Sequence, residues 1–227
     1  MDSAFASIVA IVAVAGLLVV TGLRRQPGLG AVAAVVVVAM VLAMRGDGLA
    51  SLGLGALDAS WWRTLLLALG LGVAIQLLSV LVVEPWSERW TGVPHDHGIV
   101  DGVRGSARAF GLWMLVVWLV IAPIEEVLFR GFLMTEIARL VGTGFWASVL
   151  NVAATSIVFG LAHAYQGRSG VLSTGVAGAA LGVAFVASGF DLWLVILAHG
   201  FVDTVGLALV ATGADRAWRG RRADDAG

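Results

Sequence analysis

Seven long apolar segments constrain this chain more than any other feature of its sequence. The hydrocarbon core of a bilayer is crossed by a helix of about 20 apolar residues, and backbone groups inside it must be hydrogen-bonded within the protein. We therefore predict an all-α polytopic membrane protein, a bundle of about seven transmembrane helices. The predicted spans are Phe5–Leu23, Gly28–Met44, Thr64–Val83, Phe110–Leu140, Phe145–Ala164, Val171–Ser188 and Leu192–Thr212.

The composition excludes several classes of protein. Hydrophobic residues make up 59% of the chain and charged residues 13%, which is unlike a disordered chain, a coiled coil or a soluble enzyme. The chain has no cysteine, so disulfides, thiolate metal sites and thiol nucleophiles are excluded. A net charge of −1 does not favour nucleic acid. We expect a multi-pass cell-membrane protein, and the Arg-only basic residues and Ala, Val and Gly content suggest a bacterial plasma membrane.

The chain divides into three parts within one membrane domain. Residues 1–108 are expected to form helices and loops without a motif, residues 109–213 hold the polar motifs, and residues 214–227 form a polar tail. Arginine placement predicts the orientation, because cytoplasmic loops are enriched in basic residues. With the C-terminus in the cytosol, ten arginines flank the inner ends of the spans and three the outer ends. The inner set is Arg24, Arg25, Arg89, Arg104, Arg108, Arg168, Arg216, Arg219, Arg221 and Arg222.

Ionisable side chains lie within the predicted spans. Burying such a group in the membrane costs free energy, so these residues are functional candidates by default. They fall in three short segments, 125–130, 159–163 and 199–203. Residues four apart share a helix face. We therefore expect Glu126 to pair with Arg130 and His199 to reach Asp203.

The predicted depth of Glu125, His163 and His199 in the membrane places these three side chains close together. Glu125 points about 100° away from Glu126 on the helix and is left out of the Glu126–Arg130 pair. Glu125 and His163 lie about equally far from a Gly-rich turn at 141–144 that joins their helices. With His199 they form one predicted polar cluster. Taken singly, each segment also has a structural interpretation: a neutralising ion pair, a packed histidine or an interhelical clamp.

The histidines of the loop between the third and fourth spans receive a different interpretation. His95, Asp96 and His97 lie in a polar stretch, Glu84 to Arg108, and we expect solvated loop residues there. Alanine at either histidine is expected to be silent.

The three segments resemble the motifs of the CPBP family of intramembrane proteases, which includes the CAAX prenyl endopeptidases of the Rce type and bacterial abortive-infection-type relatives. The family motifs are Glu-Glu-x-x-x-Arg, Phe-x-x-x-His and His-x-x-x-Asn or Asp. Here they read Glu125-Glu126-Val-Leu-Phe-Arg130, Phe159-Gly-Leu-Ala-His163 and His199-Gly-Phe-Val-Asp203. The resemblance covers about Ala109 to Leu209.

The resemblance implies hydrolysis of a peptide bond in a membrane-associated substrate. Glu125 would activate a water with help from His163, and His199 with Asp203 would stabilise the oxyanion, while Arg130 supports the site as a charge partner. Phe129 and Phe159 are candidates for packing or substrate contacts beside the site. The implied partners are a membrane-associated or lipid-anchored peptide or protein and the bilayer.

Two chemical questions stay open in the sequence. An ionised Asp203 cannot donate to an oxyanion, so it must be protonated, orient His199 or ligate a metal. Glu125, His163 and His199 could also be three ligands of an open zinc site, with Glu126 as the base, whereas a metal-free glutamate mechanism needs no cofactor.

Two rival functions use the same residues. A proton-coupled transporter or channel could use Glu125, His163 and His199 as a relay, although the chain has no internal repeat. A catalytically silent adaptor or bacteriocin-immunity protein could keep the same scaffold. The intact Glu and His set argues against lost chemistry.

Overall fold

The computed structural model describes residues 3–56 and 60–215, and it contains no strand in these ranges. Residues 216–227 of the predicted tail 214–227, with four of the arginines used for orientation, lie outside the described residues. The longer helices are α1 (Ser3–Leu23), α2 (Pro27–Arg45), α3 (Trp61–Leu78), α5 (Ala107–Val116), α8 (Phe145–Ala162), α9 (Gly167–Ala187) and α10 (Leu192–Thr212). Shorter ones are α4 (Glu84–Thr91), α6 (Ala122–Glu126) and α7 (Thr135–Val141).

The all-α membrane fold is confirmed. Seven helical stretches in the described residues are long and apolar enough to cross a membrane, and the chain is a multi-pass membrane protein. They are Ala4–Leu23, Pro27–Arg45, Trp61–Thr91, Ala107–Val141, Phe145–Ala162, Ala164–Ala187 and Leu192–Thr212. The predicted polar stretch from Glu84 begins too early, because the third helix continues as α4 to Thr91. Its Ser87 is buried and its Oγ lies 2.7 Å from that of Ser169 at the start of α9.

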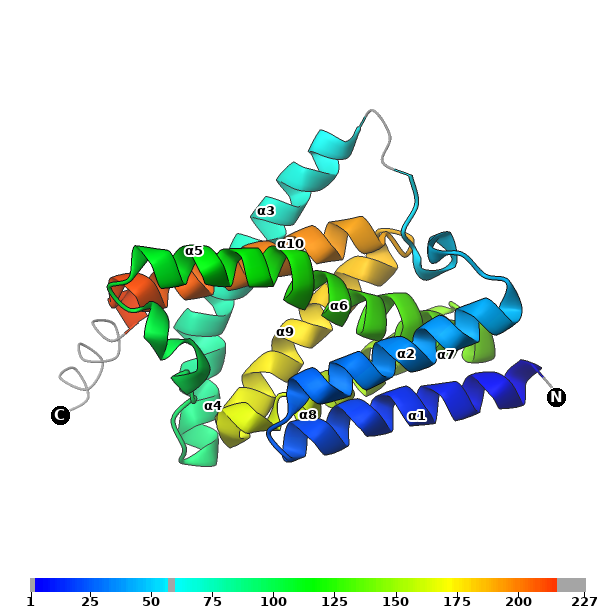
Figure 1. Cartoon of the computed structure of the whole chain (residues 1–227), viewed down its shortest axis with the longest axis horizontal. Helices are drawn as coiled ribbons and strands as arrows, with labels where there is room; N and C mark the ends of the chain where they lie inside the picture. Colours follow the sequence, from blue (N-terminus) through cyan, green and yellow to red (C-terminus); the bar gives the residue numbers. More distant parts are fainter. Residues whose placement is uncertain (1–2, 57–59, 216–227) are drawn as a thin grey trace.

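Helices pack in close pairs that bring distant segments together (Figure 1). α1 runs beside α2, α8 beside α9, and α3 crosses α10. Small residues permit the crossing of α3 and α10, as is usual between membrane helices. A Cβ on Gly72 would lie only 2.5 Å from the Ala198 carbonyl oxygen, next to His199.

In a bundle whose helices cross the membrane in alternating directions, the first, third and fifth loops lie on one side. In the structure these loops contact one another. Arg25 Nη2 lies 3.7 Å from Asp96 Oδ2 and donates to the Tyr165 carbonyl at 3.2 Å, which joins the first, third and fifth loops. On the other side the Leu192 amide donates to the Gly53 carbonyl at 3.1 Å. The contacts divide the loops into two sets, as seven crossings require.

The span that carries both glutamates is not a regular α-helix. Pro123 lies in the first turn of α6, a five-residue segment between two π-helical ones, η4 (Val117–Ile121) and η5 (Val127–Met134). Proline supplies no backbone N–H, and π-helical turns occur often at functional sites. The wider turn changes the direction in which each side chain of this span points.

Candidate active site

Glu125 projects from α6 into a site formed by three helices. Its Oε2 lies 3.7 Å from His163 Nε2 and 3.9 Å from His199 Nε2. This oxygen is buried and has no hydrogen-bond partner among the described residues. The structure therefore brings together the three residues that the depth argument expects to meet.

Glu126 points away from the open site and is fully buried. Its Oε1 accepts from Arg130 Nη1 at 2.7 Å, as the spacing predicts, and also lies 2.7 Å from His199 Nδ1. Arg130 donates further to the Gly178 carbonyl of α9 at 2.8 Å. The bond to His199 is missed by the sequence, because no helical spacing relates residues 126 and 199.

His163 ends α8, since its backbone leaves the helical conformation. Its Nδ1 lies 2.8 Å from the Phe159 carbonyl oxygen. That oxygen can only accept, so Nδ1 carries the proton. The Nε2 atom, which faces Glu125, then holds a lone pair when the ring is neutral.

His199 lies one turn before Asp203 on α10, and its ring is held between two acidic groups. Nδ1 faces Glu126, whereas Nε2 lies 3.7 Å from Asp203 Oδ2. Asp203 thus lies on the Glu125 side of the ring, and its side chain is 29% exposed. The residue that orients the ring through Nδ1 is Glu126, not Asp203.

Two phenylalanines pack beneath these polar groups. Phe159 stands edge-on to Phe129, with ring centroids 4.8 Å apart, and lies 4.5 Å from the His163 ring centroid. The Arg130 guanidinium carbon lies 4.8 Å from the Phe159 ring centroid, within cation–π range. Both rings are buried, so they pack and exclude water.

A cavity of about 1070 Å³ opens onto the cluster. Glu125, His163, His199 and Asp203 line it, together with largely apolar side chains from α2, α5, α9 and α10. Glu126 does not line it. A space of this size suits a short peptide segment rather than a single ion.

The donor types of Glu125, His163 and His199 suit zinc, but their spacing does not. Ligands of a tetrahedral zinc ion lie roughly 3.4 Å apart, given bonds of about 2.1 Å. Within the described part of the chain, the group whose ligand atoms all lie within 4.8 Å of one another is Glu84, His95 and His97. The ligand atoms of the Glu125 group do not all lie that close together, although two of their distances are 3.7 and 3.9 Å. Glu126 is engaged behind His199, so it is not placed to act as the base for an ion at Glu125.

The solvated-loop interpretation of His95 and His97 is wrong. Both rings line the cavity, stacked with centroids 4.4 Å apart. His95 Nδ1 lies 3.0 Å from Ser173 Oγ of α9, and His97 Nε2 lies 3.8 Å from Glu84 Oε2. Asp96, half exposed and paired with Arg25, does face outward. In an extended loop, residues 95 and 97 point to the same side. The prediction used only the polar composition of the loop and missed this spacing.

One comparison with known proteins bears on this site. Residues 107–205 match the family model described as Type II CAAX prenyl endopeptidase Rce1-like. This segment is Rce1-like. The match contains all three motifs and confirms the family resemblance. No curated protein and no solved structure matches the chain. The Rce1-like segment begins at α5, so Glu84 of α4 and the loop with His95 and His97 lie outside the matched range.

Proposed function

We propose that this protein is an intramembrane endopeptidase of the CAAX type that hydrolyses a peptide bond of a membrane-associated substrate with a water activated by Glu125. One observation carries the proposal. The Glu125 Oε2 atom is buried without a hydrogen-bond partner in the described residues, lies within 4 Å of two imidazole nitrogens, and faces a cavity of peptide size. The Glu125 side chain is 22% exposed and lines the cavity, from which a water can reach the carboxylate.

In this mechanism, Glu125 is the general base. Its carboxylate takes a proton from the water while the water oxygen forms a bond to the carbonyl carbon of the substrate. His163, whose Nε2 lone pair faces the same place, accepts a hydrogen bond from the second O–H of the water, which stays on the attacking oxygen, and so orients the water. When the tetrahedral intermediate collapses, the C–N bond breaks and Glu125 returns the proton to the leaving amine.

His199 stabilises the oxyanion in this proposal. Because Nδ1 donates to Glu126, the ring donates through Nε2 only when it is doubly protonated. Glu125 and Asp203 lie beside Nε2, and Glu126 lies at Nδ1. These negative groups favour the charged ring, which gives Asp203 an electrostatic role at the donor atom. Donors set in place before the reaction stabilise developing charge most effectively.

Glu126 and Arg130 are positioning residues. They touch neither the cavity nor the Glu125 carboxylate, but they fix His199 and tie α6 to α9 through Gly178. The ion pair neutralises both charges where water is absent.

The substrate we propose is a lipid-anchored or membrane-embedded peptide in a bacterial plasma membrane. The name of the matching family refers to prenylated CAAX ends. The apolar walls of the cavity suit an acyl or prenyl chain beside the peptide.

A cleavage assay on the purified full chain in liposomes tests the proposal. Fluorogenic peptides are offered with a farnesylated C-terminal cysteine, with an N-terminal acyl chain and without lipid. Glu125→Gln should lower the rate by about 10²- to 10⁴-fold, the usual contribution of a general base. Asp191→Asn is the matched carboxylate-to-amide control, because Asn is an equally good helix cap and Asp191 caps α10 away from the cavity.

Two outcomes would overturn the proposal. One is cleavage by Glu125→Gln at the wild-type rate. The other is proton flux across the liposomes that needs Glu125 while no peptide is cut, which would establish the transporter alternative.

A further inference from the structure

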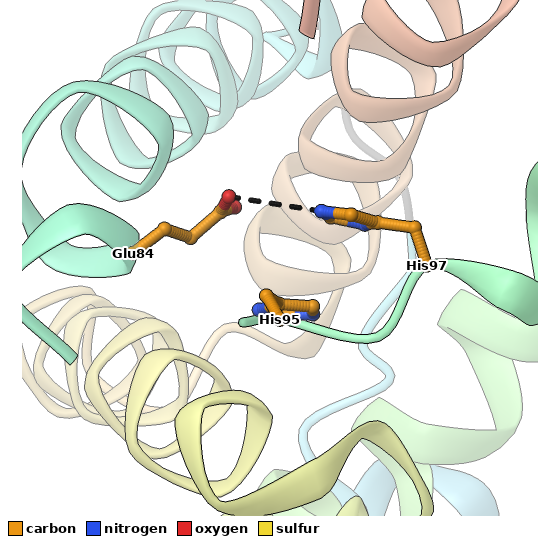
Figure 2. A group of neighbouring side chains, drawn as sticks. All are labelled: Glu84, His95 and His97. Carbon is orange, nitrogen blue, oxygen red and sulfur yellow. Dashed lines mark ion pairs between the residues drawn. The ribbon is translucent and has the colours of Figure 1, made fainter. Parts of the chain in front are cut away.

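A second group of ligand-type side chains lines the same cavity, outside the Rce1-like segment. Glu84 at the start of α4 faces His95 and His97 from the following loop (Figure 2). One ligand atom from each lies within 4.8 Å of the other two. Within this group, His97 Nε2 lies 3.8 Å from Glu84 Oε2.

We propose that Glu84, His95 and His97 bind a divalent transition-metal ion, for which zinc is the best fit. Two imidazoles and one carboxylate form a common three-ligand zinc set that leaves a fourth position for water. To reach tetrahedral spacing the ligand atoms must approach one another by up to about 1.4 Å. The single carboxylate neutralises half of the ion's charge, and magnesium and calcium are disfavoured because they prefer oxygen ligands.

The surroundings of His95 are those of a metal ligand. A ligating histidine donates its other ring N–H to an oxygen, which fixes the ring. Ser173 Oγ can accept that proton from His95 Nδ1 at 3.0 Å, because Ser173 itself donates to the Gly170 carbonyl at 3.2 Å. The proposal assigns the Nε2 atom of His95 to the ion. The backbone N–H of His95 also donates to Glu88 Oε1 at 2.9 Å, which holds the loop against α4.

Burial separates this group from ordinary surface charge clusters. The Glu84 side chain is only 10% exposed and that of His97 25%. A carboxylate removed from water is stabilised by opposite charge, and a metal ion would add positive charge beside Glu84 and His97. The cavity gives an entry path, since both histidines line it.

The bound ion would link the loop to α4. The stacked histidines form part of the cavity wall, so metal binding would stiffen that wall without touching Glu125. This site is independent of the proposed hydrolysis, and its test requires no substrate.

Metal binding is measured on the full chain in detergent, freed of metal with a chelator and reloaded with Zn²⁺ or Co²⁺. We expect about one ion per chain by elemental analysis, a tetrahedral Co²⁺ absorption spectrum and a higher melting temperature with zinc. Ser173→Ala should weaken binding roughly 10- to 100-fold, as loss of an outer hydrogen bond does. His97→Gln should abolish the Co²⁺ spectrum. Asp96→Asn, an acid between the two histidines that points outward, is the matched control and should bind normally.

A triple variant, Glu125→Gln with His163→Ala and His199→Ala, separates the two polar groups of the cavity. It leaves the loop intact and should keep the ion and the spectrum. Failure of this variant or of wild-type protein to bind zinc contradicts the proposal. So does an ion that is lost in the triple variant but kept in His97→Gln. These readings do not depend on whether every loop variant folds.

Discussion

Glu125 and Glu126 are adjacent residues with opposite surroundings. Glu126 is fully buried, with Oε1 between a guanidinium and an imidazole, whereas Glu125 lines the cavity and its side chain is 22% exposed. The 100° between successive helical residues accounts for this difference. In the proposed enzyme, Glu125 takes part in the reaction, whereas Glu126 holds His199 in position.

A double substitution tests whether Glu125 and His199 act on one water and one carbonyl. We expect Glu125→Gln and His199→Ala each to lower kcat/KM by about 10²- to 10⁴-fold, and the double variant to be hardly worse than either. Groups that act as a unit are strongly non-additive. Initial rates of peptide cleavage in liposomes give the answer. Rate losses that multiply would mean that the two residues act in separate steps.

The Glu126–Arg130 pair should affect folding more than chemistry. Removing one member of a buried ion pair costs about 3–5 kcal/mol, so Arg130→Ala and Glu126→Gln should lower both melting temperature and folded yield in detergent. Arg25→Ala is the matched control. Its pair with Asp96 is exposed, and such pairs contribute about 1 kcal/mol or less. A well-folded Arg130→Ala protein without activity would instead make Arg130 catalytic.

At the scale of elements, the site depends on how closely helices approach. His199 lies on α10 where that helix crosses α3, and only a residue without a side chain fits at Gly72. The π-helical turns on both sides of α6 affect the direction in which its glutamate side chains point. The position of the motif residues thus depends on backbone contacts made by residues outside the three motifs, such as Gly72.

Two alanine substitutions in α3 test this contact. Gly72→Ala places a Cβ 2.5 Å from the Ala198 carbonyl oxygen, whereas a Cβ at Gly70 meets nothing within 4 Å. We expect Gly72→Ala to lower melting temperature and cleavage rate together, by displacing α10. Gly70→Ala should be neutral or slightly stabilising, because alanine favours helix more than glycine does. Equal behaviour of the two variants would show that the crossing does not hold His199.

At the scale of the whole molecule, loops of one side join around the mouth of the site. Arg25 links the first, third and fifth loops, and Arg104 binds Asp215 after the last span with an Nη2–Oδ2 distance of 2.6 Å. Those hydrogen bonds to Asp215 raise the pKa of Arg104. Seven spans put these loops and the end of α10 on one side, which arginine placement predicts to be the cytosol.

Reporter fusions test that orientation. A fluorescent reporter that matures only in the cytosol should be active after Arg222, and a periplasmic phosphatase should be inactive there. Fusions at Gly142, in the turn between α7 and α8, should give the reverse result. A phosphatase that is active after Arg222 would invert the topology and place the loop with His95 and His97 outside.

Much of this protein can be predicted from its sequence, because lipid leaves few choices. Apolar length determines the seven spans, and the cost of burying charge identifies Glu125, Glu126, Arg130, His163 and His199 as exceptional. Fixed helical spacing predicts the Glu126–Arg130 pair. The order of the motifs predicts the resemblance to the family whose model matches residues 107–205.

Only the tertiary structure decided which side chains meet across helices. His199 uses Glu126 through Nδ1 and has Asp203 at Nε2, although the one-turn spacing favours Asp203 as its sole partner. Likewise, His95 and His97 lie in the cavity although their loop is polar. Spacing along the chain describes one helix at a time, whereas these contacts depend on the crossing of separate helices and on a loop folded back between them.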